Sequence, residues 1–138
     1  MTRLRIELLG FAALLLGAGF WHLLWPQDFV PAIPEILRGW ARPIVIVTGI
    51  LEIVLGLPVL WCAIWPHHPS FSKLAARALK VSAAYFVGLL WVHIEVSLRA
   101  VPVFGIDDTR LLWVRTLLQF PLTLWTYRLS QRVLSQHS

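Results

Sequence analysis

Apolar residues dominate four stretches of this chain, and polar residues concentrate in the segments between them. Each stretch reaches the length of about 20 residues that an α-helix needs to cross a bilayer. Helix is the expected structure, because every backbone polar group inside a bilayer must be satisfied within its own segment. The pattern predicts an all-α protein, a transmembrane four-helix bundle that forms one domain over residues 1–138. The expected spans are residues 6–25, 43–65, 74–98 and 111–129.

The first span also fits a second interpretation. Arg3 and Arg5 precede its apolar core, as basic residues do in a signal peptide. The apolar core continues through Trp21 and Trp25, however, and three more spans follow it. These features favour a helix that is retained in the membrane.

Lysine and arginine residues at the ends of the spans predict their orientation. The side with both termini and the second connection has Arg3, Arg5, Lys73, Arg77, Lys80, Arg128 and Arg132, and the other side has Arg38, Arg42, Arg99 and Arg110. Because cytoplasmic loops carry the excess of such residues, both termini are expected in the cytoplasm. The chain is then a multi-pass protein of the cell (inner) membrane. Its first outer loop, residues 26–42, is expected to contain a short helix within "PEILRGW".

Composition agrees with this interpretation and excludes several functions. Hydrophobic residues make up 58% of the chain and charged residues 14%, against about 25% charged in soluble domains. The net charge of +5 does not indicate nucleic-acid binding, because Lys and Arg stand at the ends of apolar runs. Cys62 is the single cysteine, which excludes an internal disulfide and a quinone-linked disulfide-forming enzyme.

Polar residues inside the predicted spans indicate where a site would lie. Ionisable side chains are rare in spans and usually face the interior of a bundle. At 1.5 Å per residue, these side chains lie about 5 to 13 Å from the outer ends of their spans, which places them all in the outer half. They are His22, Glu52, His93, Glu95, Arg115 and Gln119. We therefore predict a buried polar cluster there that binds a ligand.

Glu52 is expected to face this layer and to find Arg115, Gln119 or His93 as its partner. Depth along the spans favours Glu95 over Glu52 as the partner of Arg115. Two carboxyl groups would then share one cation, so that either a carboxyl group keeps its proton or a histidine is charged. Such a cluster has the chemistry to handle protons.

The same residues also have structural interpretations. Glu95 can pair with Arg99 one helical turn further on. His22 can be an interfacial residue beside the neighbouring tryptophans. Glu52 and Arg115 can lock the second helix to the fourth without binding any ligand.

No metal site is expected. His22, His93 and a carboxylate are residue types that bind zinc, but they follow no recognisable spacing. His67 and His68 are adjacent and lack a third ligand, which is typical of a solvated turn.

Small residues are expected where helices approach one another closely. Gly49 and Gly56 share a face of the second span with Glu52. Ala13 and Gly17 form a similar notch on the first span.

Three stretches of the chain resemble the DoxX-like family of small membrane proteins: "GAGFWHLLWPQDFVPAIPEIL", "TGILEIVLGLPVL" and "VRTLLQFPLTLWTY". The matching positions are Gly17, Gly19, His22, Trp25, Pro26, Phe29, Ile33 and Pro34, then Gly49, Glu52 and Gly56, then Arg115, Gln119 and Trp125. Two positions depart from the family pattern. The third span has "LWVH" where many relatives have "FPAN", so His93 replaces an asparagine, and Leu117 replaces a proline.

The resemblance implies a four-helix membrane bundle. Some members are linked to quinone-coupled sulfur oxidation or to membrane-associated redox-stress complexes, and related bundles are assembly factors. We expect a membrane subunit or accessory of a redox (quinone-linked) system rather than a stand-alone enzyme. Arg115 and Gln119 would donate hydrogen bonds to a quinone-like or lipid head group, and Glu52 or His93 would manage a proton.

No intrinsic cofactor is expected, because no haem pair, flavin motif or dithiol is evident; a bound quinone or lipid is expected instead. The expected partners are the lipid bilayer and other membrane protein subunits or further copies of this chain. The alternative function is a non-catalytic scaffold or assembly subunit of a larger membrane protein complex. A third is an oligomeric pathway for protons or small solutes.

Overall fold

The computed structural model describes residues 2–66 and 68–135, and helices make up most of this part of the chain. The α-helices are labelled α and the 3-10 helices η. In chain order they are α1 (Arg3–Leu24), η1 (Pro26–Asp28), η2 (Val30–Ala32), η3 (Glu35–Trp40), α2 (Ala41–Ile64), α3 (Pro69–Arg99) and α4 (Thr109–Ser135). The prediction of an all-α protein is confirmed.

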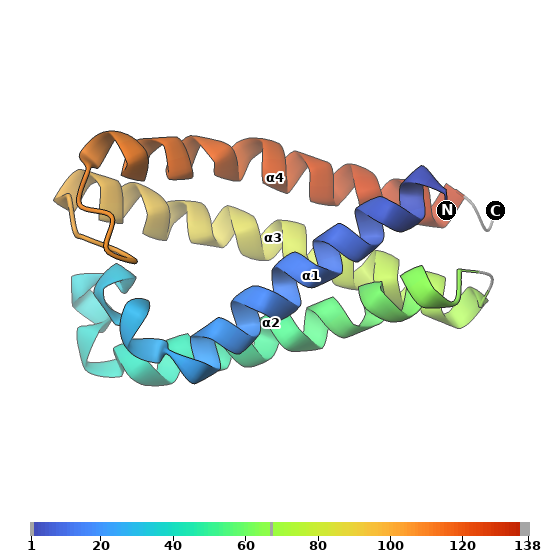
Figure 1. Ribbon diagram of the computed structural model, residues 1–138, viewed down its shortest axis with the longest axis horizontal. Coiled ribbons are helices and arrows are strands. Elements are labelled where there is room, and N and C mark those ends of the chain that lie inside the picture. The colour runs from blue at the N-terminus through green and yellow to red at the C-terminus, as the bar shows by residue number, and fades with distance from the viewer. Residues whose placement is uncertain (1, 67, 136–138) are drawn as a thin grey trace.

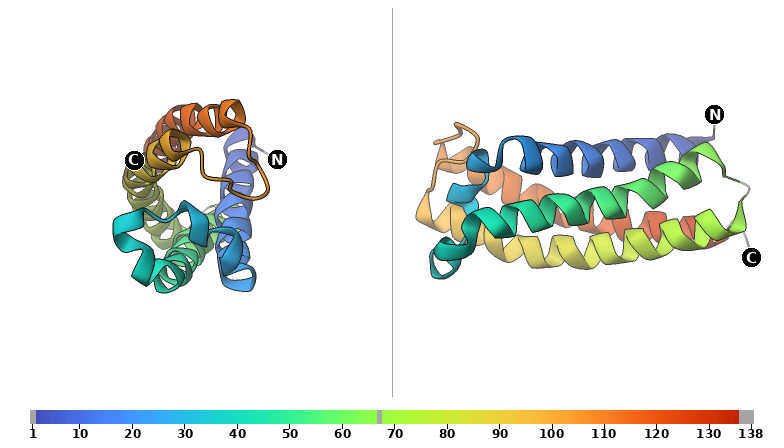
Figure 2. Two further views of the ribbon diagram at one scale, coloured as in Figure 1. Left: turned by 90° about the vertical axis from the view of Figure 1, so that its left-hand side faces the viewer. Right: turned by 90° about the horizontal axis from the view of Figure 1, so that it is seen from below.

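The four α-helices run lengthwise beside one another, and the two ends of the chain lie at the same end of the molecule (Figure 1). We call this the terminal end and the opposite one the far end. Helix α1 packs along α2, α3 packs along α4, and α2 also contacts α3, whereas α1 and α4 meet only over a short stretch. Seen from the far end, the connections at residues 25–40 and 100–108 lie across the helix ends (Figure 2).

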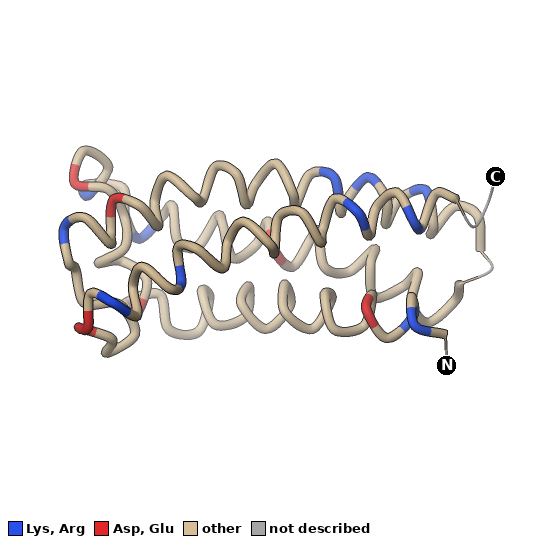
Figure 3. The backbone as a smooth tube through the Cα atoms, turned by 90° about the horizontal axis from the view of Figure 1, so that it is seen from above, with Lys and Arg blue, Asp and Glu red and all other residues tan. Residues whose placement is uncertain are grey.

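Three helices in the described residues are long and apolar enough to cross a membrane. They are Arg3–Leu24, Pro69–Arg99 and Glu35–Ile64, in which η3 runs directly into α2. This finding indicates a membrane protein. Lysine and arginine residues lie toward both ends of the helices, with most of them toward the terminal end, and the middle is nearly free of charge (Figure 3).

The helices extend beyond the predicted spans because a helix can continue outside the hydrocarbon layer. Helix α3 begins at Pro69 rather than at residue 74, and proline suits this first position because its missing N–H would be unpaired there. Helix α4 continues to Ser135 rather than ending at residue 129. The predicted short helix in "PEILRGW" is present as η3, with 3-10 rather than α geometry.

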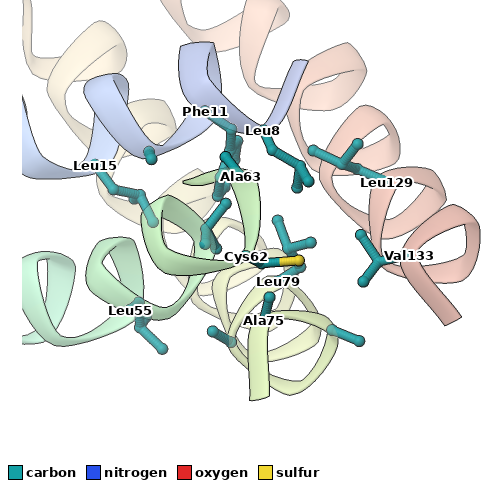
Figure 4. Close-up of a cluster of buried hydrophobic side chains, with 14 of the residues drawn as sticks. Leu8, Phe11, Leu15, Leu55, Cys62, Ala63, Ala75, Leu79, Leu129 and Val133 are labelled. Carbon is teal, nitrogen blue, oxygen red and sulfur yellow. The ribbon is translucent and has the colours of Figure 1, made fainter. Parts of the chain in front are cut away.

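The apolar core fills the half of the molecule next to the terminal end. Figure 4 shows buried side chains from all four α-helices meeting there, including Phe11, Leu79 and Leu129. Cys62 lies in this core as a buried residue. The far end has a much smaller apolar cluster, formed by Ala32, Val96, Val103 and Leu112. Apolar packing therefore holds one end of the molecule together and leaves the other end less filled.

Backbone contact between two glycines brings α1 and α2 together. A Cβ atom added to Gly19 would lie 2.7 Å from the Gly49 carbonyl oxygen, and one added to Gly49 would lie 2.6 Å from the His22 Cβ. Gly56 similarly lies against Leu16, at 3.0 Å. Of the four residues predicted to pack helices, Gly49 and Gly56 therefore do so.

The predicted notch of Ala13 and Gly17 is wrong. Both residues are exposed, and a Cβ atom added to Gly17 would meet nothing within 4 Å. The notch is at Gly19 instead. Successive residues of a helix are turned by about 100°, so a difference of two positions moves a side chain to another face.

Substituting these glycines tests the contact. Gly19→Ala and Gly49→Ala are each expected to lower the stability of the protein by about 1–3 kcal/mol, because the added methyl group overpacks the α1–α2 contact. The measurement is unfolding in detergent micelles, followed by circular dichroism. Gly17→Ala is the matched control and is expected to leave stability unchanged or slightly raised, since alanine favours a helix more than glycine does. Equal losses at Gly17 and Gly19 would contradict this helix orientation.

Candidate functional site

A cavity of about 430 Å³ lies at the far end, between α1, α2, α3 and the 3-10 helices. Most of its wall is apolar, and polar side chains enter it at a few points. These polar residues are His22, Thr48, Glu52, Tyr85, His93 and Arg115. A mainly apolar cavity with a small number of placed polar groups is the usual form of a small-molecule site.

Glu52 is the most buried of the polar residues that line the cavity, and its carboxyl group has two hydrogen-bonding partners. Glu52 is only 4% exposed to solvent. One carboxyl oxygen accepts a hydrogen bond from the Tyr85 hydroxyl at 3.0 Å, and the other lies 2.9 Å from Nδ1 of His22. Because a buried carboxyl group without partners costs several kcal/mol, these contacts explain how the helix tolerates Glu52.

His22 is held in a defined orientation. Its Nδ1 lies 2.9 Å from both the Ala18 carbonyl oxygen and the Glu52 carboxyl group. A carbonyl oxygen can only accept, so the ring hydrogen sits on Nδ1 and is shared between the two. The ring also stacks on Phe29, with 3.7 Å between centroids. The His22 side chain is therefore mostly enclosed by its neighbours, at 12% exposed, and its placement at a membrane interface stays a prediction.

Arg115 and His93 form the wall of the cavity nearest α4. Within residues 2–66 and 68–135, no carboxylate lies within ion-pair distance of the Arg115 guanidinium. The His93 Nδ1 is buried and has no hydrogen-bond partner in the described residues. A buried polar atom without a partner is uncommon, and a bound ligand or water would satisfy it. These two residues are thus the polar groups of the cavity that remain available.

An aromatic cluster covers this end of the cavity. Phe104 lies 5.4 Å from the ring of Trp21 and 4.7 Å from that of Phe29, measured between centroids, and the Arg115 guanidinium sits 5.8 Å above it. Phe104 has a φ of 55° and Gly105 a φ of 73°, inside a tight turn closed by hydrogen bonds between Val103 and Ile106. A phenylalanine seldom adopts a positive φ, so its ring contacts compensate a backbone cost of about 1–3 kcal/mol.

Two predicted members of the cluster do not line this cavity. The Gln119 side chain donates to the Phe86 carbonyl at 3.2 Å and joins α4 to α3. Glu95 pairs with Arg99 at 3.2 Å, as the structural interpretation of Glu95 expected, and not with Arg115. Gln119 does line a smaller hollow on the outer face, together with His93 and Arg115.

The predicted pairing of Glu52 with Arg115, Gln119 or His93 is wrong. Helix α2 packs against α1 and α3, so the partners of Glu52 come from those helices. Arg115 and Gln119 belong to α4, which packs mainly against α3. Glu52 therefore does not lock α2 to α4. It joins α1, α2 and α3 instead.

Tyr85 is the functional candidate that sequence reasoning missed. Its position carried a signal, because Tyr85 lies in the middle of the predicted span at residues 74–98 rather than at a membrane interface. A buried tyrosine hydroxyl usually has a hydrogen-bond partner, so a mid-span tyrosine predicts an acceptor on a neighbouring helix.

The chemistry of the site follows from these contacts. Tyr85, Glu52 and His22 form a continuous hydrogen-bonded chain across three helices. Arg115 and His93 face the same cavity, where the guanidinium pairs with no carboxylate and the His93 Nδ1 has no hydrogen-bond partner among the described residues. No group of three His, Cys, Asp or Glu side chains in the described residues converges to hold a metal ion. Of the adjacent histidines, His67 lies outside the described residues, and the His68 ring stacks on Phe71.

A family model described as "Domain of unknown function (DUF8561)" matches residues 11–130. The chain belongs to the DUF8561 family. The DUF8561 match includes all the residues that line the cavity. No curated protein and no solved structure matches the chain. The resemblance to DoxX-like proteins stays a prediction.

Removing carboxyl groups tests the assignment of partners. Glu52→Ala is expected to lower stability by about 1–3 kcal/mol, because the Tyr85 hydroxyl loses its carboxylate acceptor, whereas the His22 N–H keeps the Ala18 carbonyl oxygen as its acceptor. Glu95→Ala, the matched control, is expected to cost about 0–1 kcal/mol, because it removes a half-exposed pair within one helix. Unfolding in detergent measures both. A large loss of stability in Arg115→Met would instead indicate that Arg115 pairs with a carboxyl group such as that of Glu52, which would contradict this assignment.

Proposed function

We propose that this protein binds a quinone-like ligand in the far-end cavity and acts as a membrane subunit or accessory of a redox system. The observation that carries the proposal is the Arg115 guanidinium beside His93, on the wall of a mainly apolar cavity of about 430 Å³, where no carboxylate of the described residues pairs with it. The expected function and its residues rest on the sequence resemblance and on this geometry together.

The chemistry of the wall favours a neutral carbonyl ligand over an anionic head group. Arg115 and His93 can donate hydrogen bonds to carbonyl oxygens of a flat ring. The aromatic and aliphatic wall, including Phe29 and Trp91, suits the faces of such a ring. A phosphate would have only one guanidinium as its partner and would share the cavity with the Glu52 carboxyl group.

The hydrogen-bonded chain supplies a route for protons. A quinone takes up two protons with every two electrons when it is reduced to a quinol. Glu52 accepts hydrogen bonds from Tyr85 and His22 beside the cavity and can exchange a proton with the histidine. The electrons come from an electron-transfer protein that the accessory serves. This assigns Arg115 and His93 to ligand binding and Glu52 and His22 to proton handling.

The proposed membrane arrangement has four crossings with both termini in the cytoplasm. Four polar residues of α4 are buried and face inward, namely Thr116, Gln119, Thr126 and Ser130. Its outward face is apolar, and Leu117 and Leu118 are 62% and 61% exposed. A helix in water would show the opposite pattern, so the arrangement supports lipid contact for α4 although its composition is more polar than that of the other helices.

Ligand binding tests the proposed function directly. Arg115→Met is expected to weaken binding of a short-chain quinone analogue about tenfold or more, because a hydrogen bond to a charged group contributes about 1.5–3 kcal/mol. His93→Leu is expected to weaken it about two- to tenfold, because a hydrogen bond from a neutral group contributes about 0.5–1.5 kcal/mol. Quenching of tryptophan fluorescence measures binding, since Trp91 lines the cavity. Stability in detergent is expected to change little.

Arg110→Met is the matched control, because Arg110 lies on the same helix and does not line the cavity. It is expected to bind the analogue as the wild type does. Equal weakening in this control would contradict the site. A wild-type protein that binds no quinone and purifies in mild detergent with other membrane proteins would favour the scaffold function.

Accessible cysteines test the orientation. In a Cys62→Ser background, a membrane-impermeant maleimide is added to intact cells that express Thr2→Cys, Asp107→Cys or Ser135→Cys. Labelling of Asp107→Cys alone is expected, because residue 107 lies at the far end and the other two lie at the terminal end. Labelling of Ser135→Cys with Asp107→Cys would show that α4 does not cross the membrane.

A further inference from the structure

A second hollow lies at the terminal end, where α1 meets α4, opposite the proposed quinone site. Its volume is about 700 Å³. Its wall contains three arginines, Arg3, Arg128 and Arg132, together with Glu7, Trp125 and two aliphatic residues. Cationic and apolar surfaces therefore share one hollow at the end of the membrane helices.

Glu7 holds two of the arginines in place. Its carboxylate pairs with Arg3 at 3.1 Å within α1 and with Arg132 across to α4, and it accepts a hydrogen bond from the Trp125 indole N–H at 3.4 Å. These contacts fix the relative position of the two helices at this end. Both guanidinium groups stay accessible to solvent, since the Arg3 side chain is 90% exposed and the Arg132 side chain is 44% exposed.

The charges in this hollow do not balance. One carboxylate faces three guanidinium groups, so the described residues that line the hollow have a net excess of two positive charges. In the part of the chain that the structure describes, Arg128 has no carboxylate within ion-pair distance. Arg128 and Arg132 also lie four residues apart on one face of α4, a spacing at which like charges repel. An anion bound to Arg128 would reduce this repulsion.

We propose that this hollow binds the head group of an anionic phospholipid. The phosphate would pair with Arg128 and Arg3, and the first acyl carbons would lie along Ile6, which is 55% exposed beside the arginines. Trp125 on the same wall is the residue type that favours the boundary between head groups and acyl chains. Basic pockets between membrane helices are known to bind such head groups. The apolar side of the hollow is the reason for choosing a lipid over a free phosphate ion.

The test compares lipid binding by two variants of equal charge. Arg3→Gln/Arg128→Gln removes two cations from the hollow and keeps the contact between Glu7 and Arg132. Lys73→Gln/Arg77→Gln removes two cations from the exposed face of α3, which is outside the hollow. Native mass spectrometry of the detergent-solubilised protein counts bound phosphatidylglycerol and phosphatidylcholine at equal concentrations. Arg128→Gln alone provides a second variant that disturbs no ion pair.

The wild type and the α3 control are expected to retain phosphatidylglycerol about tenfold more strongly than phosphatidylcholine. Both variants of the hollow are expected to lose most of this preference. An equal loss in the α3 control would overturn the proposal, because the preference would then come from the overall positive charge of this end. Displacement of the lipid by the same concentration of inorganic phosphate would also overturn it in favour of a free-anion site. None of these outcomes depends on quinone binding at the other end.

Discussion

The lack of water inside a bilayer is the constraint on which this structure depends. A polar side chain in a membrane span must find its partner within the protein, because lipid offers none. Among the described residues, Glu52 is the buried charged side chain, and it has His22 of α1 and Tyr85 of α3 as its hydrogen-bonding partners. One buried carboxyl group thereby sets the relative rotation of three helices. Several polar residues of α4 likewise face α3, where Thr116 contacts Ser97 at 2.9 Å.

The path of α1 explains why the two ends of the molecule differ. At the terminal end α1 meets α4 through Glu7 and Phe11, and apolar side chains fill the space between the helices. Toward the far end, the contact between Gly19 and Gly49 holds α1 against α2 instead. Helix α4 stays with α3, so the space between the helices opens. The turn that contains Phe104 covers it and links the Trp21 ring to the Arg115 guanidinium.

The two proposed sites use different chemistry for this reason. The far-end cavity has a mostly apolar wall with one guanidinium and a few hydrogen-bonding groups among the described residues, which would suit a neutral ligand. The terminal-end hollow is open and carries an excess of arginine, so it suits an anionic head group. Arg115 and Arg128 are separated by about 20 Å along α4, which keeps the two sites independent. In the proposed membrane arrangement, α4 would thus contribute an arginine near each face of the membrane.

The sequence by itself determined the helices, their approximate ends and which polar residues lie inside them. These features follow from local composition and helical period, so Glu52, His22, His93 and Arg115 were identified as interior residues without coordinates. The tertiary structure decided which of them meet. Partners depend on which helices are neighbours and on how each is rotated, and a change of two positions, as between Gly17 and Gly19, moves a residue to another face. Only the packing of α2 between α1 and α3 therefore gave Glu52 its partners and left Arg115 free of any carboxylate in the described residues.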